Sequence, residues 1–340
     1  MKDNMTNSKS DKLSSIILII SYFGKFPNYF QLFLNSCGNN SSINWLIVTD
    51  NEEPYDYPSN MKVERTSFSD FRERVQKLYD FDIKLSSYYK ICDYKPAYGE
   101  LFKDEVKNFD FWGHCDCDLI FGDIRFFLPE EKLDKYDKIG HLGHFTLYKN
   151  TEENNIKYRL PIIQEDKEIY PYKMVFQKDS MMGFDEWNWP WYSKEKQVVT
   201  INDIYRFYNE KVDYINCFSD LTPFTDHFIE SYYEPTTNSF SSIKTKYYQL
   251  IDGKLFTHMD KKCEERLYVH FLKRKMSVSK ELGLQEHNFV MVPNSFVPEY
   301  TLRVKIKSNL LRFINPQKKQ RDYKVFKGKI VKTVRKIQNK

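Results

Sequence analysis

Two aspartates, Asp116 and Asp118, stand one residue apart at the end of an apolar run that contains Phe111 and Trp112. Side chains alternate across a strand, so a strand through this run would place His114, Asp116 and Asp118 on one face. Adjacent carboxylates are costly to bury unless a cation or hydrogen-bond donors offset their charge. Mg²⁺ and Mn²⁺ prefer such oxygen ligands and can bridge them to phosphates. The spacing predicts a divalent-metal site; the alternative is an exposed acidic turn without an ion.

The same run contains His114, Cys115 and Cys117, which also allow a zinc interpretation. Structural zinc usually takes four ligands in spaced pairs, and no second cysteine pair follows here. A strand would also turn the two thiols to the face opposite the acids. The two cysteines therefore fit a small buried pair better than a zinc site.

The elements around the acids indicate an α/β fold. An apolar run at 15–21 predicts a buried strand, 29–37 has helical spacing, and 45–50 predicts a second buried strand. Strand, helix and strand imply a right-handed parallel crossover. Ligands of open parallel sheets gather beyond the carboxyl ends of the strands, which here means residues 21–24 and Asp50. The glycine-rich loops of dinucleotide and ATP-hydrolysing enzymes are missing from this sequence.

Further along the chain, residues 86–107 are expected to be helical with an interruption near Pro96, and a short amphipathic segment covers 264–276. We expect one large domain over 14–302 with a mostly parallel central sheet, after a flexible start at 1–13.

The charge is distributed unevenly along the chain. Residues 303–340 hold 14 Lys and Arg and one acid, which leaves 38 basic and 46 acidic residues in 1–302. Apolar residues recur in the tail at helical spacing, at Tyr323, Phe326, Ile330, Val334 and Ile337. The tail is thus expected to form a basic amphipathic helix that rests on an anionic membrane surface. The alternative is a helix docked on the acidic body.

Six cysteines accompany a polar start without a secretory leader, so a reducing cytoplasm is expected. The early apolar run at 16–20 is far shorter than the roughly 20 residues that cross a bilayer.

A longer pattern resembles a known family. The string from Tyr89 to Gly99, then Phe111-Trp112-Gly113, then Asp116-x-Asp118-x-x-x-Gly122-Asp123-Ile124, is similar to bacterial capsule and surface-polysaccharide glycosyltransferases with the Asp-x-Asp motif of the GT-A type. The resemblance extends to about residue 300. It implies a GT-A-like domain with a nucleotide-sugar half at 14–135 and an acceptor half at 136–302.

The resemblance also implies roles for individual residues. A nucleotide-diphosphate sugar, by default a UDP-sugar, would lie across the first half, with Asp116 touching ribose or metal and Asp118 ligating Mn²⁺ or Mg²⁺. The expected donor-binding residues are Ser21, Tyr22, Phe23, Gly24, Asp50, Asp93, Lys95, Asp116, Lys273 and Arg274.

The segment 267–276 is similar to the closing His-Phe-x-x-Lys element of some retaining relatives. There the histidine completes the metal site, which makes His270 the third expected ligand, and a following base contacts the diphosphate. A neutral imidazole suits a metal, and Lys or Arg neutralises the departing nucleotide. The alternative is a histidine on a partly buried helix whose bases form a solvated face.

Glycosyl transfer with inversion also needs a carboxylate that takes a proton from the acceptor hydroxyl. Asp185 and Glu186, just before a tryptophan cluster, are the first candidates, and Asp226 is the second. All three can equally be ordinary loop acids. His141 and His144 are candidates for the donor-sugar pocket, although lone histidines are more often structural.

The expected function is a metal-dependent, hexosyltransferase-like glycosyltransferase that acts on a glycan or lipid-linked acceptor at the inner face of the membrane in capsule or surface-polysaccharide synthesis. A metal-dependent nucleotidyltransferase would also use paired acids, but it should have a glycine-rich phosphate loop. A non-enzymatic binding protein would use the tail on a nucleic acid or a membrane surface. Nucleic acid is not an expected partner, because the acidic body would be repelled by phosphates.

Overall fold

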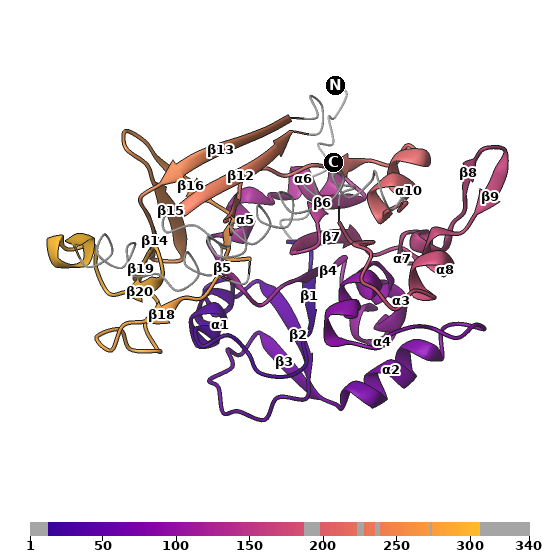
Figure 1. Cartoon of the computed structure of the whole chain (residues 1–340), viewed down its shortest axis with the longest axis horizontal. Coiled ribbons are helices and arrows are strands. Elements are labelled where there is room, and N and C mark those ends of the chain that lie inside the picture. Colours follow the sequence, from indigo (N-terminus) through magenta and orange to yellow (C-terminus); the bar gives the residue numbers. More distant parts are fainter. Residues whose placement is uncertain (1–12, 187–197, 223–227, 235–238, 273, 307–340) are drawn as a thin grey trace, which may run out of the picture.

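A computed structural model describes residues 13–186, 198–222, 228–234, 239–272 and 274–306 (Figure 1). Several predicted parts lie outside the described residues: 1–12 of the expected flexible start at 1–13, the tryptophan cluster after Glu186, the candidates Asp226 and Lys273, and the tail from 307.

The core of the described chain is a seven-stranded sheet in the order β10-β6-β7-β4-β1-β2-β3, and only β7 runs against the others. The expected mixed α/β fold with a mostly parallel central sheet is therefore confirmed. The strands are β1 (Ile16–Ser21), β2 (Ile43–Thr49), β3 (Met61–Arg65), β4 (Phe111–Cys115), β6 (Lys138–Leu142), β7 (Phe145–Lys149) and β10 (Val212–Asp213).

Strand β1 lies inside the sheet, between β4 and β2, and each of its apolar side chains is buried. Ile16, Leu18 and Ile20 belong to one hydrophobic cluster, and Ile17 and Ile19 belong to another on the opposite face. A strand that is covered on both faces reads as a continuous apolar run. Helix α1 (Phe30–Gly38) connects β1 to its parallel neighbour β2, so the predicted crossover is confirmed.

Helical segments from residues 68–106 and 157–207 pack on one face of the sheet, while α1, the helical residues 124–133 and the strands after residue 217 pack on the other. Figure 1 shows the strands of the C-terminal part beside the central sheet. The 3₁₀ helix η1 contains Pro96, where an interruption was expected within 86–107. The remaining helical segments are α2 (Phe68–Gln76), η1 (Tyr88–Ala97), α3 (Tyr98–Leu101), α4 (Lys103–Val106), α5 (Ile124–Phe127), α6 (Glu130–Lys135), α7 (Glu152–Asn155), η2 (Lys157–Arg159), α8 (Pro171–Phe176) and α10 (Ile201–Phe207). None of the helices described here is long and apolar enough to span a membrane.

Smaller sheets surround the central one. A three-stranded sheet joins β11 (Ser219–Asp220), β17 (Tyr268–His270) and β5 (Leu119–Phe121). A six-stranded sheet contains β14 (Tyr247–Ile251), β15 (Lys254–His258), β16 (Cys263–Arg266), β18 (Ser277–Val278), β19 (Phe289–Val292) and β20 (Ser295–Val297). Two hairpins, β8 (Ile162–Gln164) with β9 (Lys167–Ile169) and β12 (Phe228–Glu234) with β13 (Ser239–Thr245), complete the described strands.

Two local expectations differ from the structure. The strand predicted through His114 ends at Cys115, and residues 116–118 form a turn between β4 and β5. The segment 264–276 holds strands β16 and β17, so the alternative of a helix around His270 is wrong. In both cases pairing with a neighbouring strand, β7 for β4 and β5 for β17, decides the local structure.

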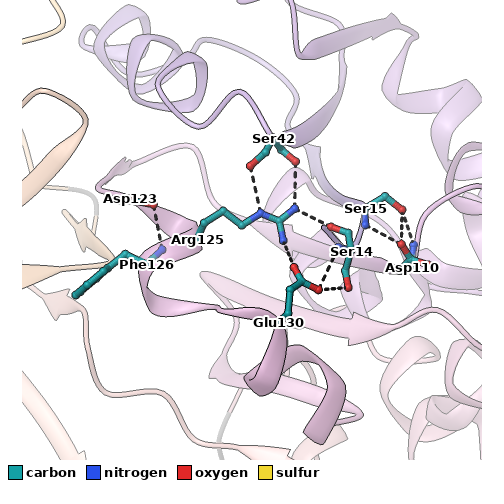
Figure 2. Close-up of polar contacts among 8 residues, drawn as sticks. All are labelled: Ser14, Ser15, Ser42, Asp110, Asp123, Arg125, Phe126 and Glu130. Atoms are coloured by element: carbon teal, nitrogen blue, oxygen red, sulfur yellow. Dashed lines mark hydrogen bonds and ion pairs between the residues drawn. The ribbon is translucent and has the colours of Figure 1, made fainter. Parts of the chain in front are cut away.

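Polar side chains fasten the amino ends of three central strands (Figure 2). Arg125 donates to the Ser14 carbonyl at 2.7 Å and to Ser42 Oγ at 3.2 Å, and it pairs with Glu130 at 3.3 Å. Ser15 donates to Asp110 from both its amide and its hydroxyl. Ser14 and Ser15 precede β1, Ser42 precedes β2 and Asp110 precedes β4. The network therefore holds the amino ends of these strands, which face away from the ligand-bearing edge of the sheet.

Replacing Arg125 with Ala should lower the free energy of unfolding by about 1–3 kcal/mol, because Glu130 and the Ser14 carbonyl lose a charged donor. The midpoint of urea denaturation measures this. Lys107→Ala is the control: its 3.5 Å pair with Asp104 is largely exposed, and its loss should change stability by less than about 0.5 kcal/mol. Equal effects of the two changes would contradict a structural role for the network.

Candidate active site

A cavity of about 530 Å³ opens beyond the carboxyl ends of β1 and β4, where open parallel sheets bind ligands. Of the residues expected from the sequence, those that line it are Ser21, Tyr22, Phe23, Lys95, Asp116, Asp118 and Arg274. The aromatic side chains in the wall are Tyr22, Phe23, Phe26, Tyr29, Tyr88, Tyr89 and Tyr98. Tyr88 and Tyr89 are each 51% exposed, so flat rings are available at the rim for a planar ligand.

Asp116 and Asp118 line this cavity, and His270 lies buried behind them, with the ligand atoms of all three within 4.8 Å of one another. The β5·β17 pairing brings them together: His270 stands opposite Leu119, and the Phe271 amide donates to the Asp118 carbonyl at 3.0 Å. His270 Nε2 lies 3.4 Å from Asp118 Oδ1. Two carboxylates and an imidazole form a donor set that suits Mn²⁺ or Mg²⁺. The residues predicted as metal ligands therefore fit such an ion.

His270 lies between two acids. Its Nδ1 is 2.8 Å from Asp220 Oδ1, on the side of the ring away from Asp118. Burial alone would lower the pKa of His270, but Asp118 and Asp220 outweigh burial and hold the pKa well above its ordinary value. The two carboxylates therefore favour the protonated imidazole when no metal is bound, and its charge in turn stabilises them.

Lys95 stabilises the carboxylate of Asp116 in the same way. Its ammonium group donates to Asp116 Oδ1 at 2.7 Å and to the Gly143 carbonyl at 2.8 Å, and it lies 3.3 Å from Asp185 Oδ2. Burial would lower the pKa of Lys95, but attraction to Asp116, Cys92 and Asp185 together outweighs burial and raises that pKa well above its usual range. A carboxylate has two oxygens, so Lys95 can hold Asp116 through one while the other binds an ion or a ribose.

Asp185 lies behind Lys95 and is 2% exposed. Burial raises the pKa of its carboxyl well above the ordinary value, against the opposing effect of Lys95. A Cβ on Gly143 would lie 2.2 Å from Asp185 Oδ2, so this tight contact needs a glycine. Glu186 is partly exposed. Both acids raise the pKa of Tyr89, to about 12, after the larger effects of burial and Cys92, so they stand close to the rim tyrosine.

Asp93 is not brought to the cavity. It is fully buried, pairs with Lys90 at 2.7 Å, and accepts bonds from the amides of Met182 and Phe184 at 2.9 Å. Lys90 in turn donates to the carbonyls of Val175 and Ser180. The carboxylate therefore fastens the segment that leads into Asp185. Asp93 is only two residues from Lys95 in the sequence, and that spacing gives no sign of its different surroundings.

The donor-binding residues expected after β1 and β2 occupy one neighbourhood. Asp50 Oδ1 accepts the Gly24 amide at 2.7 Å, and Gly24 has φ +89°, a conformation that favours glycine. Gly24 and Asp50 thus shape the turn after β1, while Ser21, Tyr22 and Phe23 line the cavity. Arg274 is buried, donates to the Thr222 carbonyl at 3.1 Å, and borders the cavity beside the exposed Lys275.

The other histidines are buried. Burial lowers the pKa of His144 well below its ordinary value and that of His141 to about 3, so both rings are neutral. Neither lines the cavity, although His144 stacks on His270 with ring centroids 4.3 Å apart. Among the described residues, the groups able to hold a metal do not include His114, Cys115 or Cys117.

Sequence reasoning missed Asp220, Lys25 and the rim tyrosine Tyr88. Lys25 follows the predicted strand at 15–21, and a position beyond the carboxyl end of a parallel strand is a usable signal. Asp220 ends a strand of two residues, which is too short to show periodicity.

The role assigned to Asp93 is testable. Asp93→Ala should lower the free energy of unfolding by about 3–5 kcal/mol, because it leaves the buried Lys90 charge without its carboxylate. Thermal unfolding without ligand measures this, with the exposed Asp104→Ala as control. A variant with wild-type stability and weakened nucleotide binding would instead support a donor contact.

Comparisons with known proteins place this geometry in context. No curated protein sequence matches the chain significantly. Among solved structures, an active-site mutant of LgtC is 11% identical with a TM-score of 0.28, and the match covers 61% of this chain and 75% of that one. The galactosyltransferase LgtC with donor and acceptor sugar analogues is 10% identical, with a TM-score of 0.27 and coverages of 61% and 76%.

Core-mannan synthase A (CmsA) from Aspergillus fumigatus in its Mn/GDP form is 17% identical with a TM-score of 0.23, and the match covers 40% of this chain and 44% of that one. TM-scores this low do not establish a shared fold. The sequence match is far more extensive, since residues 18–300 match the family of unknown function DUF6625, and the chain belongs to that family.

Proposed function

We propose that this protein is a metal-dependent glycosyltransferase that uses a nucleotide-diphosphate sugar. The observation that carries the proposal is the group Asp116, Asp118 and His270, whose two carboxylates line a cavity walled by aromatic side chains. A volume near 530 Å³ is within the range of small-molecule sites, which is roughly 300–1,000 Å³. The tyrosine-rich wall suits a base and a sugar, which both present flat or apolar faces.

The charges of the cavity favour a diphosphate bound together with a cation. Asp116 and Asp118 would repel an anionic ligand unless a divalent ion stood between them and the phosphates. The cationic side chains along the wall are Lys25, Lys95, Arg274 and Lys275. Lys95 is committed to Asp116, whereas Lys25 and Lys275 are exposed and able to reach a phosphate. Acids for the ion and bases for the phosphates thus lie in one cavity.

Asp116, Asp118 and His270 would hold Mn²⁺ or Mg²⁺, which would act as a Lewis acid on the leaving diphosphate. Arg274 and Lys275 would neutralise charge that develops on the departing nucleotide. Lys273, expected to do the same, lies outside the described residues. The residues after β1, with Gly24 held by Asp50, would position the nucleoside beside the aromatic wall.

The acceptor base is assigned to the 185–186 pair. Asp185 is too buried to meet an acceptor directly, so we give it the role of holding Lys95. Glu186 is partly exposed and close to Tyr89 at the rim, which makes it the better base for an acceptor hydroxyl. Asp226 remains a second candidate outside the described residues.

A thermal-shift panel tests this function with UDP, GDP, CDP and ADP, each with and without Mn²⁺. We expect one diphosphate, by preference UDP, to raise the melting temperature only with Mn²⁺. At 100 times the Kd, binding stabilises the native state by about 2.7 kcal/mol. Asp118→Ala should abolish the shift, while the exposed Asp104→Ala should keep it. No shift with any diphosphate, or a shift that Asp118→Ala leaves intact, would contradict the proposal.

The acceptor is proposed to be a glycan or lipid-linked glycan of capsule or surface-polysaccharide synthesis, reached from the cytoplasm. The support is the charge pattern: 14 Lys and Arg against one acid over 303–340 suit an anionic membrane surface. Nearly all of this tail lies outside the described residues.

Deleting 303–340 should abolish co-sedimentation with vesicles that contain anionic lipid, since each basic residue adds about 1 kcal/mol near such a surface. Neutral phosphatidylcholine vesicles and 0.5 M salt are the controls, and both should abolish binding by the full chain. Unchanged partitioning of the truncated protein would refute the membrane role and favour a tail docked on the acidic body.

A further inference from the structure

We propose that Asp220 is a positioning residue that aims His270 at the metal site, an inference that rests on the proposed metal-dependent function. Asp220 Oδ1 lies 2.8 Å from His270 Nδ1, while His270 Nε2 lies 3.4 Å from Asp118 Oδ1 on the opposite side of the ring. Metal-bound histidines commonly donate their second ring N–H to a carboxylate, which fixes the tautomer and the ring orientation. The acid, the imidazole and the metal-facing carboxylate here stand in that order.

The backbone holds this arrangement before any ligand arrives. β11 pairs with β17 in parallel, and Asp220 is directly opposite His270 in that register. The Leu221 amide donates to the His270 carbonyl at 3.0 Å, which fixes the two residues relative to each other. On its other edge β17 pairs with β5, which begins one residue after Asp118. Asp220 and His270 are thus set by two adjacent strands, and Asp118 directly precedes the third.

The environment of the ring adds a second restraint. His144 stacks against the face of His270 with centroids 4.3 Å apart and an interplanar angle of 30°. This packing opposes rotation of the imidazole out of the line between its two acids. Asp220 is 18% exposed, so its carboxylate is partly shielded from water and its attraction for the ring is strengthened. Asp220 therefore governs which ring nitrogen faces Asp118.

His144, Asp220 and His270 also lie close enough for a different ion site, with ligand atoms within 4.8 Å of one another. The stacking of the two rings argues against that use. An imidazole lone pair lies in the plane of its ring. Two stacked rings therefore keep their lone pairs in separate, roughly parallel planes instead of directing them toward one point. The Asp116, Asp118 and His270 group has no such stacked pair, and its two carboxylates line the cavity.

Mn²⁺ affinity of the full chain, measured without nucleotide by electron paramagnetic resonance of free Mn²⁺, tests the proposal. Asp220→Ala should weaken binding by about 10- to 100-fold, the usual effect of removing such a carboxylate. Asp220→Asn should lose less, because its amide oxygen still accepts the Nδ1–H bond but carries no charge. Asp213→Asn is the matched control, since Asp213 is 19% exposed and paired with Lys132 at 3.0 Å away from the group. It should leave the affinity unchanged.

A second variant separates the two ion positions. His144→Phe keeps a flat ring against His270 but removes both nitrogens, so Mn²⁺ affinity should be retained; a loss comparable to Asp220→Ala would overturn the proposal in favour of a His144 ligand. Melting temperatures without metal identify purely structural effects. Asp220 variants that lose stability but keep Mn²⁺ affinity would also refute it.

The outcomes also distinguish this inference from the function on which it rests. If Asp118→Ala abolishes Mn²⁺ binding and both Asp220 variants bind as tightly as wild type, the positioning role alone is wrong. If the wild-type chain binds no Mn²⁺, with or without UDP, then the metal-dependent function is wrong as well.

Discussion

The site depends on keeping two carboxylates side by side at the edge of a sheet. Asp116 and Asp118 repel each other, and each is held by a cation from a separate part of the fold. Lys95 comes from η1 and binds Asp116, while His270 comes from β17 and faces Asp118. Since burial penalises a lone charge far more than a paired one, each acid and its cation stabilise each other. The two acids and their basic partners are therefore already held together without a metal ion.

The two ends of the central sheet are treated in opposite ways. At the amino ends of β1, β2 and β4, Arg125, Glu130 and the serines satisfy one another across short polar contacts (Figure 2). At the carboxyl ends the chain forms turns, and the polar groups there surround a cavity. A sheet that is fastened at one end can present precise side-chain positions at the other. This polarity is the common property of open parallel sheets that bind ligands.

The sequence predicted those parts of the fold whose signals are local. The apolar run at 16–20 predicts a buried strand, and Asp116 with Asp118 predicts an acidic site. His270 was placed near them only through a resemblance, because nothing local links it to Asp118. Strand pairing between β5 and β17 makes that contact, and pairing partners far apart in sequence leave no periodic trace. Asp220 was not predicted for the same reason. Asp93, expected to lie near the donor, is buried against Lys90, because residues close together in a 3₁₀ helix can face different surroundings.

Solvent exposure orders the aspartates of this region by what they can do. Asp93 is fully buried, and Lys90 and two amides satisfy its charge, so it can only hold structure. Asp185, at 2%, faces inward to Lys95. Asp118 and Asp220, at 17% and 18%, flank His270, but only Asp118 lines the cavity. Asp116, at 34%, is the most exposed and borders the same cavity. Carboxylates that bind a ligand must keep their water until it arrives. Asp116 and Asp118 combine exposure with a place in the cavity lining, which is why the proposed function assigns the ligand to these two acids.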